Sequence, residues 1–144
     1  MTPQQQLAWQ CAEKMYSQDG CSNLLSLKIE QMDQGSATVS MTVTRDMLNG
    51  FETCHGGMIF SLADSAFAFA CNSENQVAVA AGCSIEYVRP GRAGDTLTAV
   101  AQARSQGKVT GTYDIEITNQ DGKLVALFRG KAHRLGRPVL EETP

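Results

Sequence analysis

The clearest alternation of apolar and polar residues in the chain runs from residue 36 to residue 43. Apolar side chains stand at every second position there, with serines and threonines between them: Ala37, Val39, Met41 and Val43. Successive side chains of a β-strand point to opposite faces of its sheet, so this pattern predicts a strand with one buried face. A turn is predicted at residues 33–35, and residues 24–32 are predicted as the strand before it.

The second half of the chain has the same kind of pattern. Four further strands are predicted, at about residues 77–88, 95–105, 110–119 and 123–135. Short glycine-containing segments at 106–108 and 121–122 predict β-hairpin turns that join the last three strands. Strands that follow one another through such turns favour an antiparallel sheet.

Two segments have helical patterns instead. Residues 3–18 carry an apolar stripe of Leu7, Cys11 and Met15, and Pro3 suits the first turn. Residues 56–72 predict a longer helix that is apolar on nearly all sides and must be covered on most of its surface. The order of elements therefore predicts an α+β fold, in which a curved antiparallel sheet wraps the long helix. The side of the helix that stays open is expected to need a second subunit.

Length and composition agree with one globular domain. A chain of 144 residues, 42% apolar and 19% charged, can bury a hydrophobic core of its own. We expect a single domain over residues 1–144, with an N-terminal helical region at 1–20 and a central helix at 56–72. No apolar run reaches the roughly 20 residues that cross a bilayer, and the N-terminus lacks the features of a signal peptide. A cytoplasmic protein without a membrane partner is expected.

The cysteine, histidine and charge patterns narrow the chemistry. Five cysteines without a C-x-x-C pair and two histidines argue against a disulfide framework or a metal site, so no metal is expected. Nine of the twelve Lys and Arg residues lie between Arg89 and Arg137, against four Asp and Glu. This excess is either a solvated sheet face or a modest anion site for a phosphorylated ligand. The acidic pI of about 5.3 argues against a nucleic-acid partner.

Asp64 is the only charged residue in the apolar stretch from Gly57 to Cys71. Burial in such surroundings raises the pKa of a carboxyl group, and folds avoid this unless partners or chemistry require it. Gly56 and Gly57 begin the same helix, where free N–H groups and the helix dipole favour developing negative charge. A carboxylate that activates water and a site for an oxyanion together predict acyl-transfer chemistry.

Spacing along the helix indicates that two copies of the chain form this site. An α-helix rises about 1.5 Å per residue, so Gly56 and Asp64 lie roughly 12 Å apart along its axis. Catalytic groups must come within about 3 Å of the reacting atoms, so one carbonyl group cannot meet both. We therefore expect a homodimer in which Gly56, helped by Gly57, binds the oxyanion. The partner subunit's Asp64 then activates water or attacks the carbonyl carbon itself.

The segment from Met47 to Asp64 resembles the hotdog-fold acyl-CoA thioesterases, specifically the phenylacetate-pathway (PaaI-type) subfamily. Its most specific feature is His55-Gly56-Gly57 followed by Asp64. Further similar segments are Tyr87–Gly91, Gly94–Leu97, Gln106–Lys108, Tyr113–Glu116 and Phe128–Arg134. The resemblance implies a hotdog fold, a dimer or a homotetramer built as a dimer of dimers, and hydrolysis of acyl-CoA without a cofactor. Phenylacetyl-CoA and its ring-hydroxylated forms are the substrates it implies.

The resemblance also suggests roles for residues around the glycines. Asn49 would place its amide near the thioester, and His55 would fix the helix entry and the orientation of the glycines. Phosphates of CoA need cationic or N–H partners, and the candidates are Arg45, Arg89, Gly107 and Lys108, with Arg92 and Arg134 behind them. Some members carry a hydroxyl residue near the attacking water on the strand after the helix. Here that region is 79–84, and Ser84 is expected to be out of register for the role.

Other interpretations stay open. Asp64 is also consistent with a structural group bonded to backbone, the two glycines with close packing, and Asn49 with a turn residue. A thiol nucleophile at Cys54 is disfavoured, because sequence neighbours rarely form the hydrogen-bonded pair that it would need with His55. Competing functions are an enoyl-thioester hydratase or dehydratase that uses His55 and Asp64, a non-catalytic acyl-CoA-binding protein, and a purely structural oligomer. The Gly-Gly context favours the thioesterase.

Overall fold

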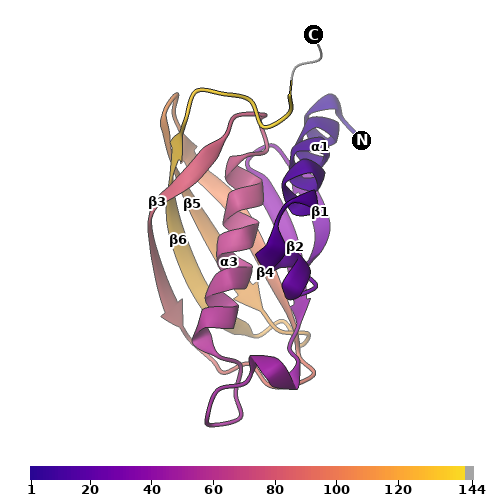
Figure 1. The fold of residues 1–144 in the computed structure, drawn as a ribbon. Coiled ribbons are helices and arrows are strands. Elements are labelled where there is room, and N and C mark those ends of the chain that lie inside the picture. Colours follow the sequence, from indigo (N-terminus) through magenta and orange to yellow (C-terminus); the bar gives the residue numbers. More distant parts are fainter. Residues whose placement is uncertain (142–144) are drawn as a thin grey trace.

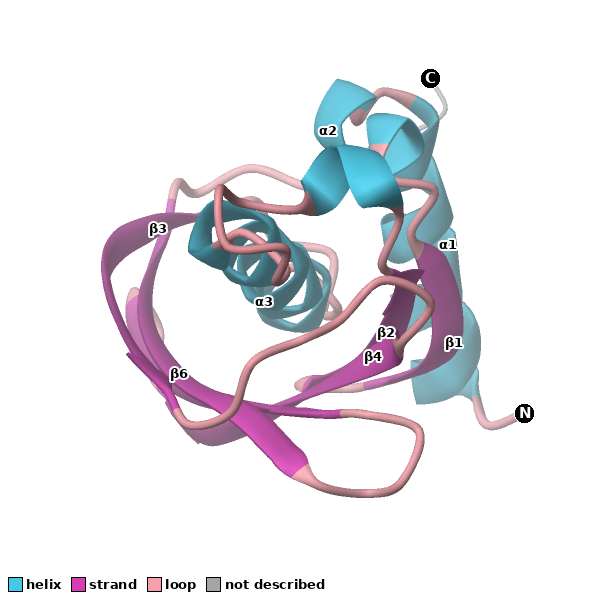
Figure 2. Cartoon of the chain, turned by 90° about the horizontal axis from the view of Figure 1, so that it is seen from below, coloured by secondary structure: helices cyan, strands magenta, loops and turns pink. Residues whose placement is uncertain are grey.

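The structure, a computed structural model, describes residues 1–141. A single curved sheet holds a long helix in its concave face, and shorter helices lie at one side (Figures 1 and 2). In chain order the elements are α1 (Pro3–Ser17), α2 (Gly20–Leu24), β1 (Lys28–Asp33), β2 (Ser36–Thr42), the 3₁₀ turn η1 (Arg45–Met47), α3 (Gly56–Cys71), β3 (Ala78–Tyr87), β4 (Thr96–Gln106), β5 (Thr110–Thr118) and β6 (Leu124–Arg134).

The six strands are antiparallel throughout and lie in the order β1-β2-β4-β5-β6-β3. The strand that follows α3 in the sequence, β3, therefore lies at the edge and pairs with the last strand, β6. Figure 2 shows the sheet curling around α3, with α1 and α2 on the β1 side. The expected α+β architecture, a central helix wrapped by a curved antiparallel sheet, is confirmed.

One expected element needs correction. The strand predicted at residues 24–32 begins only at Lys28, because residues 20–24 form the short helix α2. Asp19 caps this helix by accepting the Ser22 N–H at 2.9 Å. Ser26 then adopts a φ of 52°, in the left-handed region, and turns the chain into β1. A helix of five residues is too short to show a period in the sequence.

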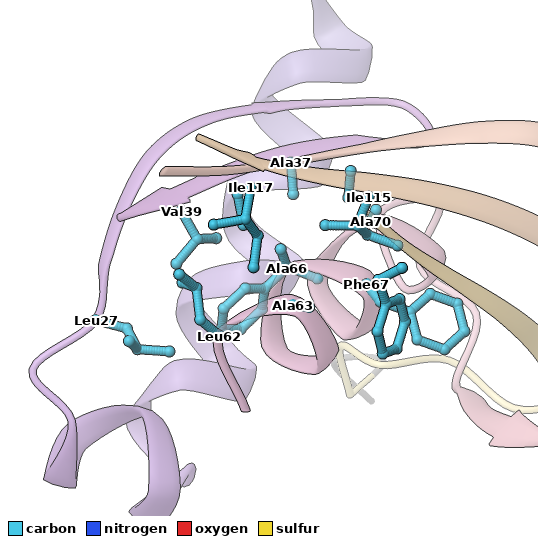
Figure 3. Close-up of a cluster of buried hydrophobic side chains, with 14 of the residues drawn as sticks. Leu27, Ala37, Val39, Leu62, Ala63, Ala66, Phe67, Ala70, Ile115 and Ile117 are labelled. Carbon is cyan, nitrogen blue, oxygen red and sulfur yellow. The ribbon is translucent and has the colours of Figure 1, made fainter. Parts of the chain in front are cut away.

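The core lies between α3 and the sheet (Figure 3). Small side chains on α3 bring the helix close to the strands, and larger ones fill the remaining space; the fully buried members include Leu62, Ala63, Ala66, Phe67 and Ala70. Gly130 on β6 makes room for the Phe67 ring, since a Cβ at that position would lie 2.6 Å from a ring carbon. Burial of a side chain as large as that of Phe67 stabilises the fold by about 1.5–3 kcal/mol.

One side of α3 is not covered by the chain itself. Figure 1 shows this side facing the viewer between β3 and α1. The half-buried residues of the helix recur at helical spacing on it: Phe60, Ser61, Asp64, Ser65 and Ala68. The neighbouring edge strand β3 is exposed along most of its length. This is the open side for which the sequence predicts a second subunit.

Within residues 1–141, no helix combines the length and the apolar character that crossing a membrane requires.

Candidate active site

The loop before α3 is held by hydrogen bonds of its own backbone and of Asn49. The Asn49 carboxamide oxygen accepts the N–H groups of Phe51 at 2.9 Å and Thr53 at 3.2 Å. Its Nδ2 donates to the Thr53 hydroxyl at 2.9 Å. The His55 N–H donates to the Met47 carbonyl at 2.8 Å and closes the loop. Asn49 therefore has the structural role of a turn residue.

His55 caps the start of α3. Its Nδ1 accepts the Gly57 N–H at 2.9 Å, so the ring is fixed against the first turn of the helix. His55 is thus the N-cap of α3. The same bond corrects the expectation that both glycines have free N–H groups, because the Gly57 N–H is used by the cap. No acceptor among residues 1–141 receives the Gly56 N–H.

Tyr87, at the end of β3, contacts Gly56 directly. Its hydroxyl donates to the Gly56 carbonyl at 2.9 Å. A Cβ at position 56 would lie 3.1 Å from both Cζ and the hydroxyl oxygen of Tyr87, which is tighter than ordinary contact. A larger residue at this position would therefore push the Tyr87 ring aside. Sequence reasoning assigned Tyr87 no role, although the residue opens the similar segment Tyr87–Gly91.

A cavity of about 380 Å³ opens beside Gly56. Its lining residues come from the loop before α3, from the first turns of α3 and from the end of β3: Asn49, Thr53, Cys54, Gly56, Ile59, Tyr87, Val88, Arg89 and Pro90. Three residues singled out from the sequence, Asn49, Gly56 and Arg89, are brought together here. The Arg89 guanidinium donates to the Leu124 carbonyl at 2.8 Å, which holds this cation at the rim.

Asp64 lies two turns further along α3 and does not line this cavity. It stands on the uncovered side of the helix, where it is half-buried. It is therefore less buried than the apolar stretch around it predicts, because the elements of one chain leave this side open. No donor among residues 1–141 bonds to its carboxylate. Burial raises the pKa of the Asp64 carboxyl group, and the negative charge of Asp19 raises this pKa further.

The candidate residues for CoA phosphates are not grouped within one chain. Arg45, in η1, is exposed near the end of the sheet where α3 begins, outside the cavity. Gly107 and Lys108 lie in the β4–β5 hairpin, at the opposite end of the sheet from Gly56. The Gly107 N–H is already bonded to the Thr110 carbonyl at 2.8 Å. If these residues meet the same ligand as Gly56, they do so from different copies of the chain.

Arg134, named as a secondary candidate, is paired inside the chain. Its guanidinium donates to the Glu74 carboxylate at 2.8 Å, and its side chain is 11% exposed. This residue joins the end of β6 to the segment after α3 and offers little to a ligand.

Two thiols near the site are protonated groups. Burial, followed by the charge of Asp95, raises the pKa of Cys54 to about 11. Its sulfur contacts the His55 carbonyl oxygen at 3.8 Å, not the imidazole, so no thiol–imidazole pair forms. Burial also raises the pKa of Cys83 on β3, and the charge of Asp64 adds to the effect.

Residues 79–84 offer no hydroxyl group towards Asp64. Ile85 packs against the core, so alternate residues of β3 place Cys83 on the α3 side and Ser84 on the other face. Ser84 is thus out of register for positioning water beside Asp64 of the same chain. In the part of the chain that the structure describes, no three His, Cys, Asp or Glu side chains gather as a metal ligand set.

Comparisons with known proteins agree with this geometry. Residues 51–126 match the family model of the thioesterase superfamily. The chain is 60% identical over 135 residues to the acyl-coenzyme A thioesterase PaaI of Escherichia coli K12, covering 94% of this chain and 96% of the relative. The solved structure of the E. coli PaaI protein from the phenylacetic acid degradation operon superimposes with a TM-score of 0.92, at 60% identity, over 93% of this chain and 97% of that one.

A more distant solved structure includes a ligand. A hypothetical thioesterase from Streptococcus pneumoniae, solved with coenzyme A, is similar with a TM-score of 0.75 at 30% identity. The similarity covers 78% of this chain and 90% of that chain.

Proposed function

The chain belongs to the thioesterase superfamily and has its hotdog fold, and from this premise we propose that it is an acyl-CoA thioesterase acting on phenylacetyl-CoA-type substrates. The reaction adds water across the thioester bond and yields the free acid and coenzyme A. The observation that carries the proposal is the Gly56 N–H, which has no acceptor among residues 1–141 and lies at the start of a 16-residue helix beside a cavity. A donor in this position is suited to an oxyanion.

In this proposal the thioester carbonyl oxygen accepts the Gly56 N–H. As water attacks the carbonyl carbon, the oxygen gains negative charge, which the N–H bond and the helix dipole stabilise. Tyr87 and His55 hold the first turn so that this N–H keeps its direction. The Gly57 N–H supports the site indirectly, through the cap that it forms with His55.

Asp64 is proposed as the general base. Its carboxylate takes a proton from water as the new C–O bond forms. The tetrahedral intermediate then breaks its C–S bond, and the electron pair leaves with the sulfur of coenzyme A, which takes up the proton. A carboxyl group of raised pKa is a stronger base than an ordinary aspartate, which suits this role.

Direct attack by Asp64 on the carbonyl carbon is the alternative route. Single turnover in ¹⁸O-labelled water separates the two. Label found only in the product acid supports the general base, whereas label in the Asp64 carboxylate supports a mixed anhydride.

The site is proposed to form between two subunits. The helix α3 is continuous from Gly56 to Cys71, so Asp64 stays roughly 12 Å along the axis from Gly56 of the same chain. The uncovered side of α3 and the exposed edge of β3 adjoin each other and support a two-fold pairing there. The opposite edge, β1, carries Lys28, Glu30 and a bulge, which are features that discourage pairing. A homotetramer would be two such dimers.

The walls of the cavity support an aromatic acyl group. Ile59, Val88 and Pro90 provide apolar surface beside the Tyr87 ring. At about 380 Å³ the cavity holds one part of an acyl-CoA. Arg89 and Arg45 are proposed for the phosphates, joined by Gly107 and Lys108 of another subunit. A place in phenylacetate degradation in the cytoplasm, without a cofactor, follows from the same proposal.

The test is a thiol-release assay with phenylacetyl-CoA, its ring-hydroxylated forms, aliphatic acyl-CoAs and an enoyl-CoA. We expect free coenzyme A from the aromatic substrates at a higher kcat/KM than from the aliphatic ones. Tight binding without thiol release would favour an acyl-CoA-binding protein instead. Hydration of the enoyl-CoA with no thiol release would favour a hydratase.

A further inference from the structure

A short network of hydrogen bonds connects the N-terminal part of the molecule to the helix that carries Asp64. Asp19, the residue before α2, accepts the Ser22 N–H at 2.9 Å and the Ser22 hydroxyl at 2.6 Å. Ser22 is completely buried between α2 and α3. Both oxygens of the Asp19 carboxylate are therefore fixed in one orientation, although the residue itself is only half-buried.

The hydrogen-bond network continues onto α3 at Ser65. The hydroxyl oxygens of Ser22 and Ser65 lie 3.4 Å apart, and this is the point where α2 meets the central helix. Ser65 directly follows Asp64 and lies where the uncovered side of α3 meets α2. The Asp19 carboxylate is thus connected, through two serine hydroxyls, to the residue that follows the proposed base.

We propose that Asp19 is a positioning residue of the thioesterase site: through Ser22 and Ser65 it holds the turn of α3 that carries Asp64, and it adds a second negative charge on the α2 side of that turn. This inference rests on the proposed function, because it assigns Asp19 a role in the same reaction. Asp19 does not line the cavity at Gly56, and it acts through Asp64.

The electrostatics agree with the geometry. Burial raises the pKa of Asp64 first, and Asp19 is the charged group that raises it further. The other titratable groups that interact with Asp64 are thiols, Cys71 on α3 and Cys83 on β3. Burial raises the pKa of both thiols, so they are neutral neighbours. Asp19 therefore makes Asp64 a stronger base than burial alone would.

Replacing Asp19 by asparagine tests the charge while keeping the cap, because asparagine caps helices as well as aspartate does. We expect the acidic limb of the kcat–pH profile to move to lower pH in Asp19→Asn, with a lower kcat on the plateau and an unchanged KM. The difference from wild type should shrink at high ionic strength, since Asp19 is partly exposed to solvent. The matched control is Asp121→Asn, the same change in the exposed β5–β6 turn, which should leave the profile unchanged.

A second measurement does not depend on activity. The Asp64 carboxyl carbon is titrated by ¹³C NMR in the wild type and in Asp19→Asn, and its pKa should fall in the variant. Ser65→Ala breaks the connection without touching α2, and it should lower kcat while the acidic limb stays near that of the wild type. An acidic limb and a carboxyl titration that are both unchanged in Asp19→Asn would overturn the inference. Absence of thiol release by the wild type would instead refute the proposed function.

Discussion

At the residue scale, the proposed site depends on two residues whose surroundings differ sharply. Gly56 is enclosed by the Tyr87 ring, whereas Asp64 stands half-exposed on a side of α3 that one chain leaves open. A substitution of Gly56 should therefore act through steric contact with Tyr87, and a substitution of Asp64 should act through the loss of its charge.

Asp64→Asn keeps the shape of the side chain and removes its negative charge. We expect kcat to fall by about 10²–10⁴-fold, the usual contribution of a general base, with KM and the assembly unchanged. Because the pKa of Asp64 is raised above the ordinary value of 3.8, wild-type activity should be lost as the pH falls through a value above 3.8. Steady-state kinetics across pH check both points. Near-normal turnover by the variant would remove Asp64 from the mechanism.

Gly56→Ala introduces a Cβ 3.1 Å from the Tyr87 ring. We expect a loss of roughly 1–3 kcal/mol in the free energy of unfolding, as for other overpacked sites, together with a large fall in kcat. Tyr87→Ala in the same chain should restore much of the stability, because it removes the ring. Gly20→Ala is the matched control, since a Cβ there meets nothing within 4 Å. Denaturant unfolding that shows equal losses at positions 56 and 20 would contradict this account.

At the element scale, the beginning of α3 is determined by a side chain that caps it. His55→Ala leaves the Gly57 N–H without its acceptor, and we expect a loss of about 0.5–2 kcal/mol in stability. His55→Asn supplies a carboxamide oxygen as acceptor in place of the imidazole nitrogen and should recover most of the stability. Thermal unfolding of both variants measures the difference. If the two were equally destabilised, the imidazole would have some role other than the cap.

The helices and strands also show which parts of the fold can be predicted from the sequence. The alternation at residues 36–43 and the apolar character of α3 predicted β2 and the central helix to within about two residues. The helix α2 was missed because a single turn and a half has no detectable period. The contact between Tyr87 and Gly56 was missed for another reason: it joins residues 31 positions apart, and only the sheet brings them together.

At the scale of the whole molecule, the position of Asp64 predicts that two chains combine to form each active site. If the site combines Gly56 of one subunit with the partner subunit's Asp64, two inactive variants should complement each other. Mixed dimers of Gly56→Ala and Asp64→Asn chains contain one intact site, so a one-to-one mixture should recover about one quarter of wild-type activity. Refolding the chains together and assaying thiol release checks this. No recovery, with mixed dimers demonstrated, would place both groups within one chain.

The edge of β3 should determine the assembly. Lysine at exposed Ala80 and Ala81 places charge on that edge, and we expect dimers to dissociate and activity to fall in parallel. Gln31→Lys makes the same kind of change on the opposite edge strand, β1, and should leave the assembly intact. Sedimentation velocity measures the mass of each variant. A β3 variant that stays dimeric would show that another face of the molecule forms the dimer.

The strand order has a consequence for how the protein is made. The edge strand β3 leaves the ribosome before β4, β5 and β6, yet its one partner strand among residues 1–141 is β6, the last of the described strands to emerge. Until residues 124–134 are synthesised, β3 and the apolar helix α3 cannot pack against β6. Nascent chains with such exposed apolar surface and unpaired strand edges are prone to aggregate. Catalytic competence would thus arrive only after the C-terminal strand has been synthesised.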